Sequence, residues 1–410
     1  MKFLVIQTAY LSSWHMTEAS FPVARPDHVV VSSTGIIRVP PSAGGAVESY
    51  VSDITQMLMT KGLRVTLVSP VRDSRAFPGA EVIDVPTTFD TFPLKPVSSA
   101  LAHIMGGLRT AHEVRRYFLS TEPNSGTILH MNEEISAALL LRSLPGIPKI
   151  FTMHNPPVLD DGNPTGRTDS VLRGIAGAVS RRLICRKADI VIVLSHYFMH
   201  YINHYWDVPS ERIRVLPLPI DTTRYRPSPN ATHKGEEILY VGRFDQRKNV
   251  SSLVRAMRQV NHGTRLTLVG KGPLRESIAA YVRAHDLEHR IRILSEVALD
   301  ELVKIYQQSD VFVLPTSLDV YPRVIVEAAA SGLPVILPDL PIFQDFKNNG
   351  FVHFVKQAEP SLLAQAIEEL SVDEKTRNIM SQRARTFAVN NNGYEQFVDR
   401  LTAIYREAAT

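Results

Sequence analysis

The chain has 410 residues, of which 44% are hydrophobic and 21% are charged. This composition is typical of a globular protein, and the length exceeds one ordinary core, so two domains are expected. The formal net charge of +4 excludes the large basic excess of a nucleic-acid binder. No apolar run in the sequence reaches the roughly 18 residues that a membrane span needs.

Residues 1–7 read as a core strand rather than a signal peptide, because they lack a long apolar region and a small-residue cleavage site. We therefore expect a cytoplasmic protein. Basic pairs such as Arg115-Arg116 and Arg181-Arg182 are typical of a solvated helix face, and they leave open a peripheral contact with the inner face of a membrane.

The single cysteine, Cys185, excludes an internal disulfide and a cysteine-based metal site. Packing in a helix is its favoured role, although the basic residues around it could also lower its pKa. The sequence contains no Asp-x-Asp triplet and no His, Asp and Glu cluster with metal-ligand spacing. We therefore expect no metal and no other cofactor.

Strand-like runs alternate with helical patterns in the first half. Residues 1–8 read as a strand, and residues 9–43 as a long irregular segment, a kind that is usually functional or mobile in a compact domain. This alternation predicts a parallel sheet covered by helices. Further strands are predicted at residues 63–68, 81–85, 127–131, 149–154 and 189–194, with helices at residues 44–61, 97–119, 133–144 and 169–187.

A second series of strands and helices follows a strand-like run at residues 213–221 and a Pro-rich linker at residues 226–230. The chain is therefore predicted to be an α/β protein with two doubly wound, Rossmann-like halves. Strands are predicted at residues 238–242, 265–269, 290–294, 311–314, 334–337 and 351–355, with helices at residues 250–260, 273–285, 298–308 and 322–331 and a mainly helical tail from residue 360.

Two carboxylates, Asp319 and Glu327, lie in the loop and helix that follow the strand at residues 311–314. Ligands bind at such loops in α/β sheets, because unpaired backbone N–H groups and the helix dipole point outward there. An ionised carboxylate accepts from both hydroxyls of a diol, so the pair predicts a ribose or sugar site beside a phosphate. The alternative for Asp319 is simple capping of its loop. An exposed surface position fits Glu327 poorly, because its neighbours are apolar and a carboxylate there needs a partner.

Arg243 and Lys248 follow the first strand of the second half. Two cations at a strand end can bracket a diphosphate and stabilise it as its negative charge grows on leaving. A solvated basic loop is the alternative. The Gly270-Lys271-Gly272 turn after the next strand lacks the last glycine of a dinucleotide fingerprint, which disfavours a dehydrogenase and leaves Lys271 as a nucleotide contact.

Two features of the first half are further candidates. Gly44 and Gly45 precede a helix, where glycines let the backbone approach a phosphate, although a flexible turn is also consistent with them. His154 ends a strand, and the prolines after it turn the chain outward into a loop. A structural histidine is the alternative there. His130, which ends an earlier strand, is a weaker candidate of the same kind.

In this order and over nearly the whole length, the motifs resemble those of the family-4 retaining glycosyltransferases, which have the GT-B fold. The resemblance implies an acceptor-side domain at residues 1–216 and a nucleotide-sugar domain at residues 217–390, with residues 391–410 packing back on the first. Asp319 stands where the family usually has Glu, and Val320-Tyr321-Pro322 replaces the common Gly-Phe-Gly. The motifs that carry the resemblance are Gly44-Gly45-Ala46-Val47-Glu48, His154, Tyr240-Val241-Gly242-Arg243 with Lys248, and Asp319 eight residues before Glu327.

The resemblance further implies metal-independent, retaining transfer of a hexosyl unit from a nucleotide-sugar to a hydroxyl acceptor. A UDP-sugar is the favoured donor, and a GDP-sugar is the alternative. Arg243, Lys248, His154 and Asp319 would act at the reacting sugar and the leaving diphosphate. Two other functions stay open: a GT-B sugar-nucleotide epimerase, and a nucleotide-sugar-binding protein without transfer activity. The donor would be bound by Gly44, Gly45, Lys271, Ser295, Val297, Val320, Tyr321 and Glu327, with residues 9–43 as part of the acceptor wall.

Overall fold

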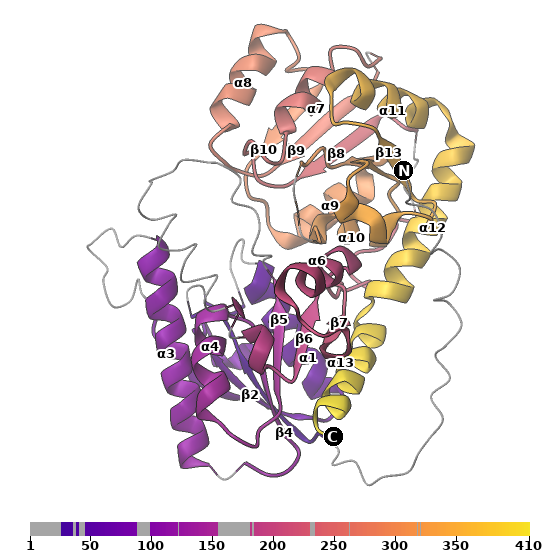
Figure 1. The fold of residues 1–410 in the computed structure, drawn as a ribbon. Helices are drawn as coiled ribbons and strands as arrows, with labels where there is room; N and C mark the ends of the chain where they lie inside the picture. Colours follow the sequence, from indigo (N-terminus) through magenta and orange to yellow (C-terminus); the bar gives the residue numbers. More distant parts are fainter. Residues whose placement is uncertain are drawn as a thin grey trace.

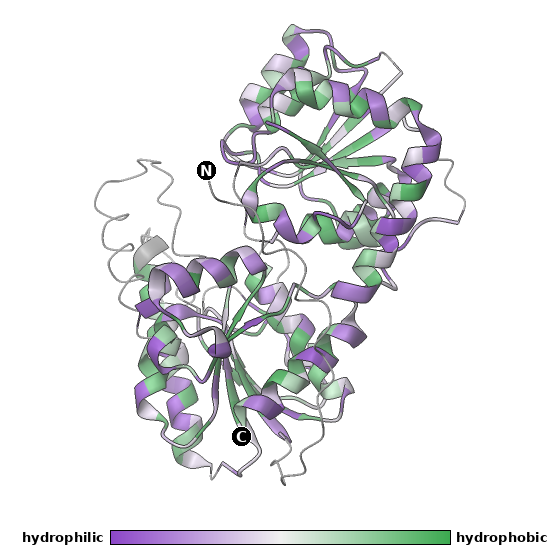
Figure 2. Cartoon of the chain, turned by 45° about the vertical axis from the view of Figure 1, so that its right-hand side comes forward, coloured by the Kyte–Doolittle hydropathy of each residue, from purple (hydrophilic) through white to green (hydrophobic). Residues whose placement is uncertain are grey.

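Two parallel β-sheets, each covered by helices, form the two halves of the molecule in this computed structural model (Figure 1). The prediction of two Rossmann-like parallel-sheet halves is confirmed. The strands are the most hydrophobic parts of each half, while the outer faces of the helices are hydrophilic (Figure 2). The structure describes residues 26–35, 38–40, 46–87, 99–121, 123–154, 181–182, 184–229, 234–261, 263–317, 319 and 321–410.

The first sheet has seven strands in the order β3-β2-β1-β4-β5-β6-β7, and all neighbouring strands are parallel. Its strands are β1 (His28–Ser32), β2 (Arg64–Ser69), β3 (Glu81–Asp84), β4 (Thr127–Met131), β5 (Lys149–Met153), β6 (Ile190–Val193) and β7 (Ile213–Val215). The helices of this half are α1 (Ala46–Thr60), α3 (Ser99–Ser120), α4 (Glu134–Ser143) and α6 (His196–Trp206), with 3-10 turns at Ser74–Ala76 and Ser210–Arg212.

Both faces of the first sheet are buried, as is usual for parallel sheets. Because side chains alternate along a strand, Val29 and Val30 of β1 face opposite sides. Val29 belongs to the cluster that includes Ile54 of α1. Val30 belongs to the cluster that includes Val114 of α3 and Leu140 of α4.

The predicted irregular segment at residues 9–43 is wrong for residues 28–32, which form β1 between β2 and β4. All five residues of β1 are buried. The apolar run at residues 29–31 is short and lies in a segment rich in Pro and Ser, which favours a loop, whereas its pairing with β2 and β4 shows that it is a strand. The predicted strand at residues 1–8 lies outside the described residues. Helix α6 at His196–Trp206, capped by the Ser195 side chain, is not among the predicted elements.

The second sheet has six parallel strands in the order β10-β9-β8-β11-β12-β13. Each predicted strand and helix of this half is present, with ends that differ by a few residues. The strands are β8 (Glu237–Val241), β9 (Arg265–Val269), β10 (Ile291–Leu294), β11 (Val311–Val313), β12 (Val335–Pro338) and β13 (Val352–Val355). The helices are α7 (Val250–Ala256), α8 (Arg275–Ala284), α9 (Leu299–Gln308), α10 (Arg323–Ala330) and α11 (Pro360–Val372), with a 3-10 helix at Pro341–Phe346.

The chain crosses between the halves twice, and the two crossings lie side by side. The first follows β7, and the second joins α12 (Glu374–Asn392) to α13 (Tyr394–Ala408). The backbone N–H of Ile220 donates to the carbonyl of Asn392 over 2.8 Å, and the Asn392 side chain donates to the carbonyl of Leu218 over 2.7 Å. Helix α13 then packs against α1 and β5, so the end of the chain lies on the first half (Figure 1).

The sequence also raises two questions, the role of Cys185 and the presence of a membrane span. Cys185 is buried, and burial raises the pKa of its thiol to about 12, which agrees with packing rather than with reactivity. Among the helices of the described ranges, none combines the length and the apolar character of a membrane span.

Candidate active site

The carboxyl ends of strands from both sheets face each other across the boundary between the halves. His196 is the first residue of α6, which follows β6 and is capped by Ser195, and Asp345 lies in the 3-10 helix that follows β12. The Asp345 carboxylate accepts from the backbone N–H of His196 over 2.9 Å and lies 3.0 Å from its Nδ1 atom. Carboxyl ends of parallel strands are where α/β sheets bind ligands, so this boundary contains the candidate site.

The loops after β8 and β9 pack backbone against backbone. The N–H of Gly242 donates to Val269 over 3.0 Å, and the N–H of Phe244 donates to Lys271 over 2.9 Å. Gly270 has a φ of +151°, and a Cβ atom there would collide with the carbonyl oxygen of Gly242. The turn that precedes α8 is therefore built for close contact between two backbones.

Arg243 is held at its backbone, while its side chain is largely exposed. The hydroxyl of Tyr240 donates to the Arg243 carbonyl over 2.7 Å. The guanidinium is 69% exposed and lies 3.4 Å from the Asp245 carboxylate. A bound anion could therefore reach it without breaking a buried contact.

Lys248 forms an ion pair with Asp319, and both side chains are only about one-fifth exposed. The loops that carry them are also joined through the Arg247 carbonyl, which accepts from the N–H of Ser317 over 2.8 Å and from the hydroxyl of Thr316 over 3.1 Å. The structure thus brings together a predicted cation and a predicted acid from two different strand ends.

Glu327 is 7% exposed and lies in a buried polar cluster. The hydroxyl of Tyr306 donates to it over 3.0 Å, Tyr225 forms a second hydrogen bond, and Arg323 lies 3.3 Å away. Burial raises the pKa of the Glu327 carboxyl, and these three partners oppose that rise. The sequence predicts that this buried carboxylate needs a partner, and the structure provides three.

The remaining donor candidates of the second half differ in exposure. The Tyr321 side chain is buried, and its hydroxyl lies 3.2 Å from the Asn392 amide at the crossing between the halves. Lys271 is exposed and lies 2.5 Å from the Glu296 carboxylate. Ser295 is exposed, while Val297 packs partly against the core.

His154 lies at the end of β5, where it contacts Asn132 and the ring of Tyr50. Its Nε2 atom is 3.0 Å from Oδ1 of Asn132, and the Tyr50 ring centre is 4.7 Å away. The Asn132 amide donates to the carbonyl of Ser32, which turns its oxygen toward His154. Burial lowers the pKa of His154 to about 3, so the ring is neutral at physiological pH. Because Nε2 carries the proton, Nδ1 is left as an acceptor.

Asn132 is a site residue that the sequence analysis did not identify. Its signal in the sequence is a polar residue directly after the strand β4, and the structure shows that it is buried. His130 is the opposite case. It is fully buried, with Nδ1 2.7 Å from the Tyr405 hydroxyl and Nε2 2.7 Å from the Thr152 hydroxyl. These contacts make His130 a structural residue that attaches α13 to the first sheet.

Gly44, Gly45 and Val320 lie outside the described residues, as does most of the segment at residues 9–43. Within the described ranges, no group of three or more His, Cys, Asp or Glu side chains is arranged to hold a metal ion.

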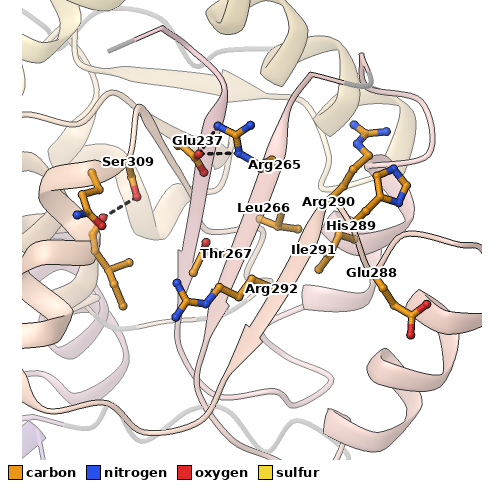
Figure 3. Close-up of a pocket in the computed structure, with 12 residues that line it drawn as sticks. Glu237, Arg265, Leu266, Thr267, Glu288, His289, Arg290, Ile291, Arg292 and Ser309 are labelled. Atoms are coloured by element: carbon orange, nitrogen blue, oxygen red, sulfur yellow. Dashed lines mark hydrogen bonds and ion pairs between the residues drawn. The ribbon is translucent and has the colours of Figure 1, made fainter. Parts of the chain in front are cut away.

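A separate pocket of about 410 Å³ lies at the opposite, amino-terminal edge of the second sheet (Figure 3). Two of its basic side chains already have partners. Arg265 pairs with Glu237, and the buried Arg290 donates to the carbonyls of Thr264 and Val260. This pocket is lined by the first residues of β8, β9 and β10 and does not include the candidate site.

The two facing parallel sheets and the polar residues at their carboxyl ends define a protein of the GT-B class. The family model for glycosyl transferases group 1 matches residues 221–387, and the model for Glycosyltransferase Family 4 matches residues 43–224. The chain belongs to the family-4 glycosyltransferases with the GT-B fold.

Individual relatives are distant. D-inositol 3-phosphate glycosyltransferase of Corynebacterium jeikeium is 23% identical over 401 residues, covering 88% of this chain and 92% of the relative. Glycogen synthase of Mycobacterium tuberculosis is 26% identical over 219 residues, or 52% of each chain, so this chain matches about half of that relative's length. Sucrose-phosphate synthase from Thermosynechococcus elongatus has the same fold, with a TM-score of 0.75, 20% identity and coverage of 93% and 98%.

Proposed function

We propose that this protein is a retaining glycosyltransferase that moves a hexosyl unit from a nucleotide-sugar to a hydroxyl acceptor without a metal ion. The observation that carries the proposal is the contact between Lys248 and Asp319. This contact joins the cation of one motif to the acid of another, and the two residues follow the carboxyl ends of the neighbouring strands β8 and β11.

The charges suit a leaving diphosphate. An ammonium has three N–H donors, so Lys248 can contact Asp319 and a phosphate together, while the exposed Arg243 adds a planar fork. Both would stabilise the negative charge that grows as the glycosidic bond breaks. In the family mechanism the leaving phosphate oxygen accepts the acceptor's proton. The neutral His154 would then serve as a hydrogen-bond acceptor for a sugar hydroxyl.

We assign the donor to the second half and the acceptor to the first, with closure of the halves excluding water. Glu327 has about four acceptor positions, of which Tyr306, Tyr225 and Arg323 occupy three, and the last is assigned to a ribose hydroxyl. UDP-sugar is favoured over GDP-sugar, since the structural neighbour HepE of Anabaena was solved with UDP-glucose. The further donor contacts proposed are Gly44, Gly45, Lys271, Ser295, Val297, Val320 and Tyr321.

The test is donor turnover in Lys248→Ala and Arg243→Ala, after a thermal-shift screen with UDP-, GDP- and ADP-sugars. Each variant should lose about 10²–10³-fold in turnover, the usual cost of one group that stabilises developing charge. Arg247→Ala is the matched control, because this exposed side chain lies in the same loop. Unchanged turnover in both test variants would refute the proposal.

A nucleotide-sugar-binding protein without transfer activity is the second candidate. Pro322 has no N–H to offer a sugar, and the carboxylates of Asp319 and Glu327 are both already paired. In that case Glu327→Ala would weaken donor binding while no acceptor in a broad screen yields product. An epimerase would instead convert the nucleotide-sugar with no acceptor present.

We place the protein in the cytoplasm and assign a peripheral membrane contact to α3. Leu101, Leu108 and Leu119 are exposed on this helix, and Arg115 and Arg116 follow the same side. Apolar and basic side chains together favour anionic bilayers. Sedimentation with anionic but not with zwitterionic vesicles is the expected result.

A further inference from the structure

Arg323 connects the two halves of the molecule through ion pairs on both sides. Its Nη2 atom donates to Asp53 of α1 over 2.9 Å, and its Nε atom lies 3.3 Å from Glu327 one turn along α10. Helix α1 belongs to the first half and α10 to the second, and α10 lies at the boundary between them (Figure 1). A single guanidinium thus bridges a carboxylate of each half.

Tyrosine hydroxyls complete the buried cluster around these three charges. Tyr394, at the start of α13, forms a hydrogen bond to Asp53, and Tyr306 and Tyr225 do so to Glu327. The side chains of Asp53 and Arg323 are only 17% and 21% exposed. The charges are therefore paired away from water, where such contacts are strong and sensitive to geometry.

The cluster lies next to the crossings of the chain between the halves. Tyr225 belongs to the first crossing, and its carbonyl accepts from Arg385 of α12 over 2.8 Å. Arg385 also donates to the carbonyl of Ala330 at the end of α10 over 2.7 Å. A change in the angle between the halves would move Asp53 relative to α10, while Tyr225 and Tyr306 stay attached to the second half.

One buried donor in the cluster has no partner. The Nη1 atom of Arg323 is inaccessible, and none of the described residues accepts a hydrogen bond from it. A purely structural ion pair is usually satisfied at every buried N–H. The unpaired Nη1 atom is consistent with an Arg323 side chain whose contacts change during function.

We propose that Arg323 is a positioning residue of the donor site. It orients the Glu327 carboxylate and, through Asp53, makes that orientation depend on the closed arrangement of the two halves. This inference rests on the proposed role of Glu327 in donor binding. Neither Arg323 nor Asp53 is assigned a contact with the reacting atoms.

The test compares Arg323→Met, Arg323→Lys, Asp53→Asn and the double variant Asp53→Asn/Arg323→Met in the full chain. UDP is the binding probe, followed by GDP if UDP does not bind, and kcat and KM for the matching donor are measured alongside. Arg265→Met is the control, because it breaks an ion pair of the second half at the opposite sheet edge. Circular dichroism checks that every variant folds.

Arg323→Met should weaken probe binding about tenfold, with a larger change in KM than in kcat. Arg323→Lys should be intermediate, because an ammonium lacks the fork that reaches both carboxylates. Asp53→Asn should weaken binding less than Arg323→Met, and the double variant should match Arg323→Met, since coupled residues are not additive. Arg265→Met should stay within about twofold of wild type.

Folded Arg323→Met and Asp53→Asn variants whose probe affinity stays within about twofold of wild type would overturn the inference. Lower thermal midpoints with unchanged affinity would do the same, because they indicate a merely structural contact. Additive losses in the double variant would refute the coupling. A wild-type chain that binds no nucleoside diphosphate would instead contradict the proposed function, and the donor-site role of Arg323 with it.

Discussion

Individual side chains at the two facing sheet edges differ in how firmly they are held. Arg243 extends into solvent from a fixed backbone, whereas Lys248 and Glu327 already make their contacts. His154 is held by Asn132 in one tautomer and one charge state. A site in which most groups are already oriented has less to order when a ligand binds.

Gly270→Ala should destabilise the protein, because the added methyl group meets the carbonyl oxygen of Gly242 and the backbone φ of +151° is unfavourable for alanine. We expect a loss of about 1–3 kcal/mol in the free energy of unfolding, measured by urea denaturation. Gly263→Ala is the control, since the nearest atom to its Cβ would be 3.8 Å away. Equal stability of the two variants would contradict this account of the turn.

At the scale of elements, α13 joins the first half although it follows the helices of the second in sequence. Its contacts with α1 include the edge-to-face pair of Phe397 and Tyr50. The ion pair between Lys61 and Asp399 adds a surface contact over 2.6 Å. Buried aromatic packing contributes more here than the exposed charges do.

Tyr405→Phe should loosen α13, because it leaves a nitrogen of the fully buried His130 without its partner. The expected cost is about 1–3 kcal/mol, seen as a thermal midpoint lower by a few degrees. Tyr281→Phe, at a partly exposed position on α8, is the control. A Tyr405→Phe variant as stable as this control would show that the hydroxyl is dispensable.

At the scale of the whole molecule, polar contacts between described residues join the two halves outside the chain crossings. Asp53 with Arg323 is one, and His196 with Asp345 is another. The second involves a titratable side chain at the boundary. The relative arrangement of the halves should therefore respond to pH.

The hydrogen bond that His196 donates to the Asp345 carboxylate raises the pKa of the histidine above its ordinary value of 6.5. A raised histidine pKa stabilises the folded protein fully below pH 6.5, and this contribution is lost as pH rises through the raised value. His196→Ala should therefore lower the thermal midpoint most at pH 5.5–6.5 and least near pH 9. His200→Ala, an exposed position on the same helix, should show no such trend. A difference that grows with pH would contradict the assignment.

Much of the fold was predictable because its signals are local. The strands and helices of the second half follow from short apolar runs, periodic patterns and turn residues. Strand β1 contains a similar apolar run, but the run covers only residues 29–31 and lies within a long segment rich in Pro and Ser, which favours a loop. Its place between β2 and β4 depends on pairing with strands far along the chain.

The sequence by itself determined most of the strands and helices, the two-sheet class and the residue types at the strand ends, because these depend on neighbouring residues. Only the tertiary structure decided which charges meet. Lys248 pairs with Asp319 from 71 residues away, and Arg323 with Asp53 from 270 residues away. Such contacts depend on strand order and on the docking of the two halves, which no local pattern encodes.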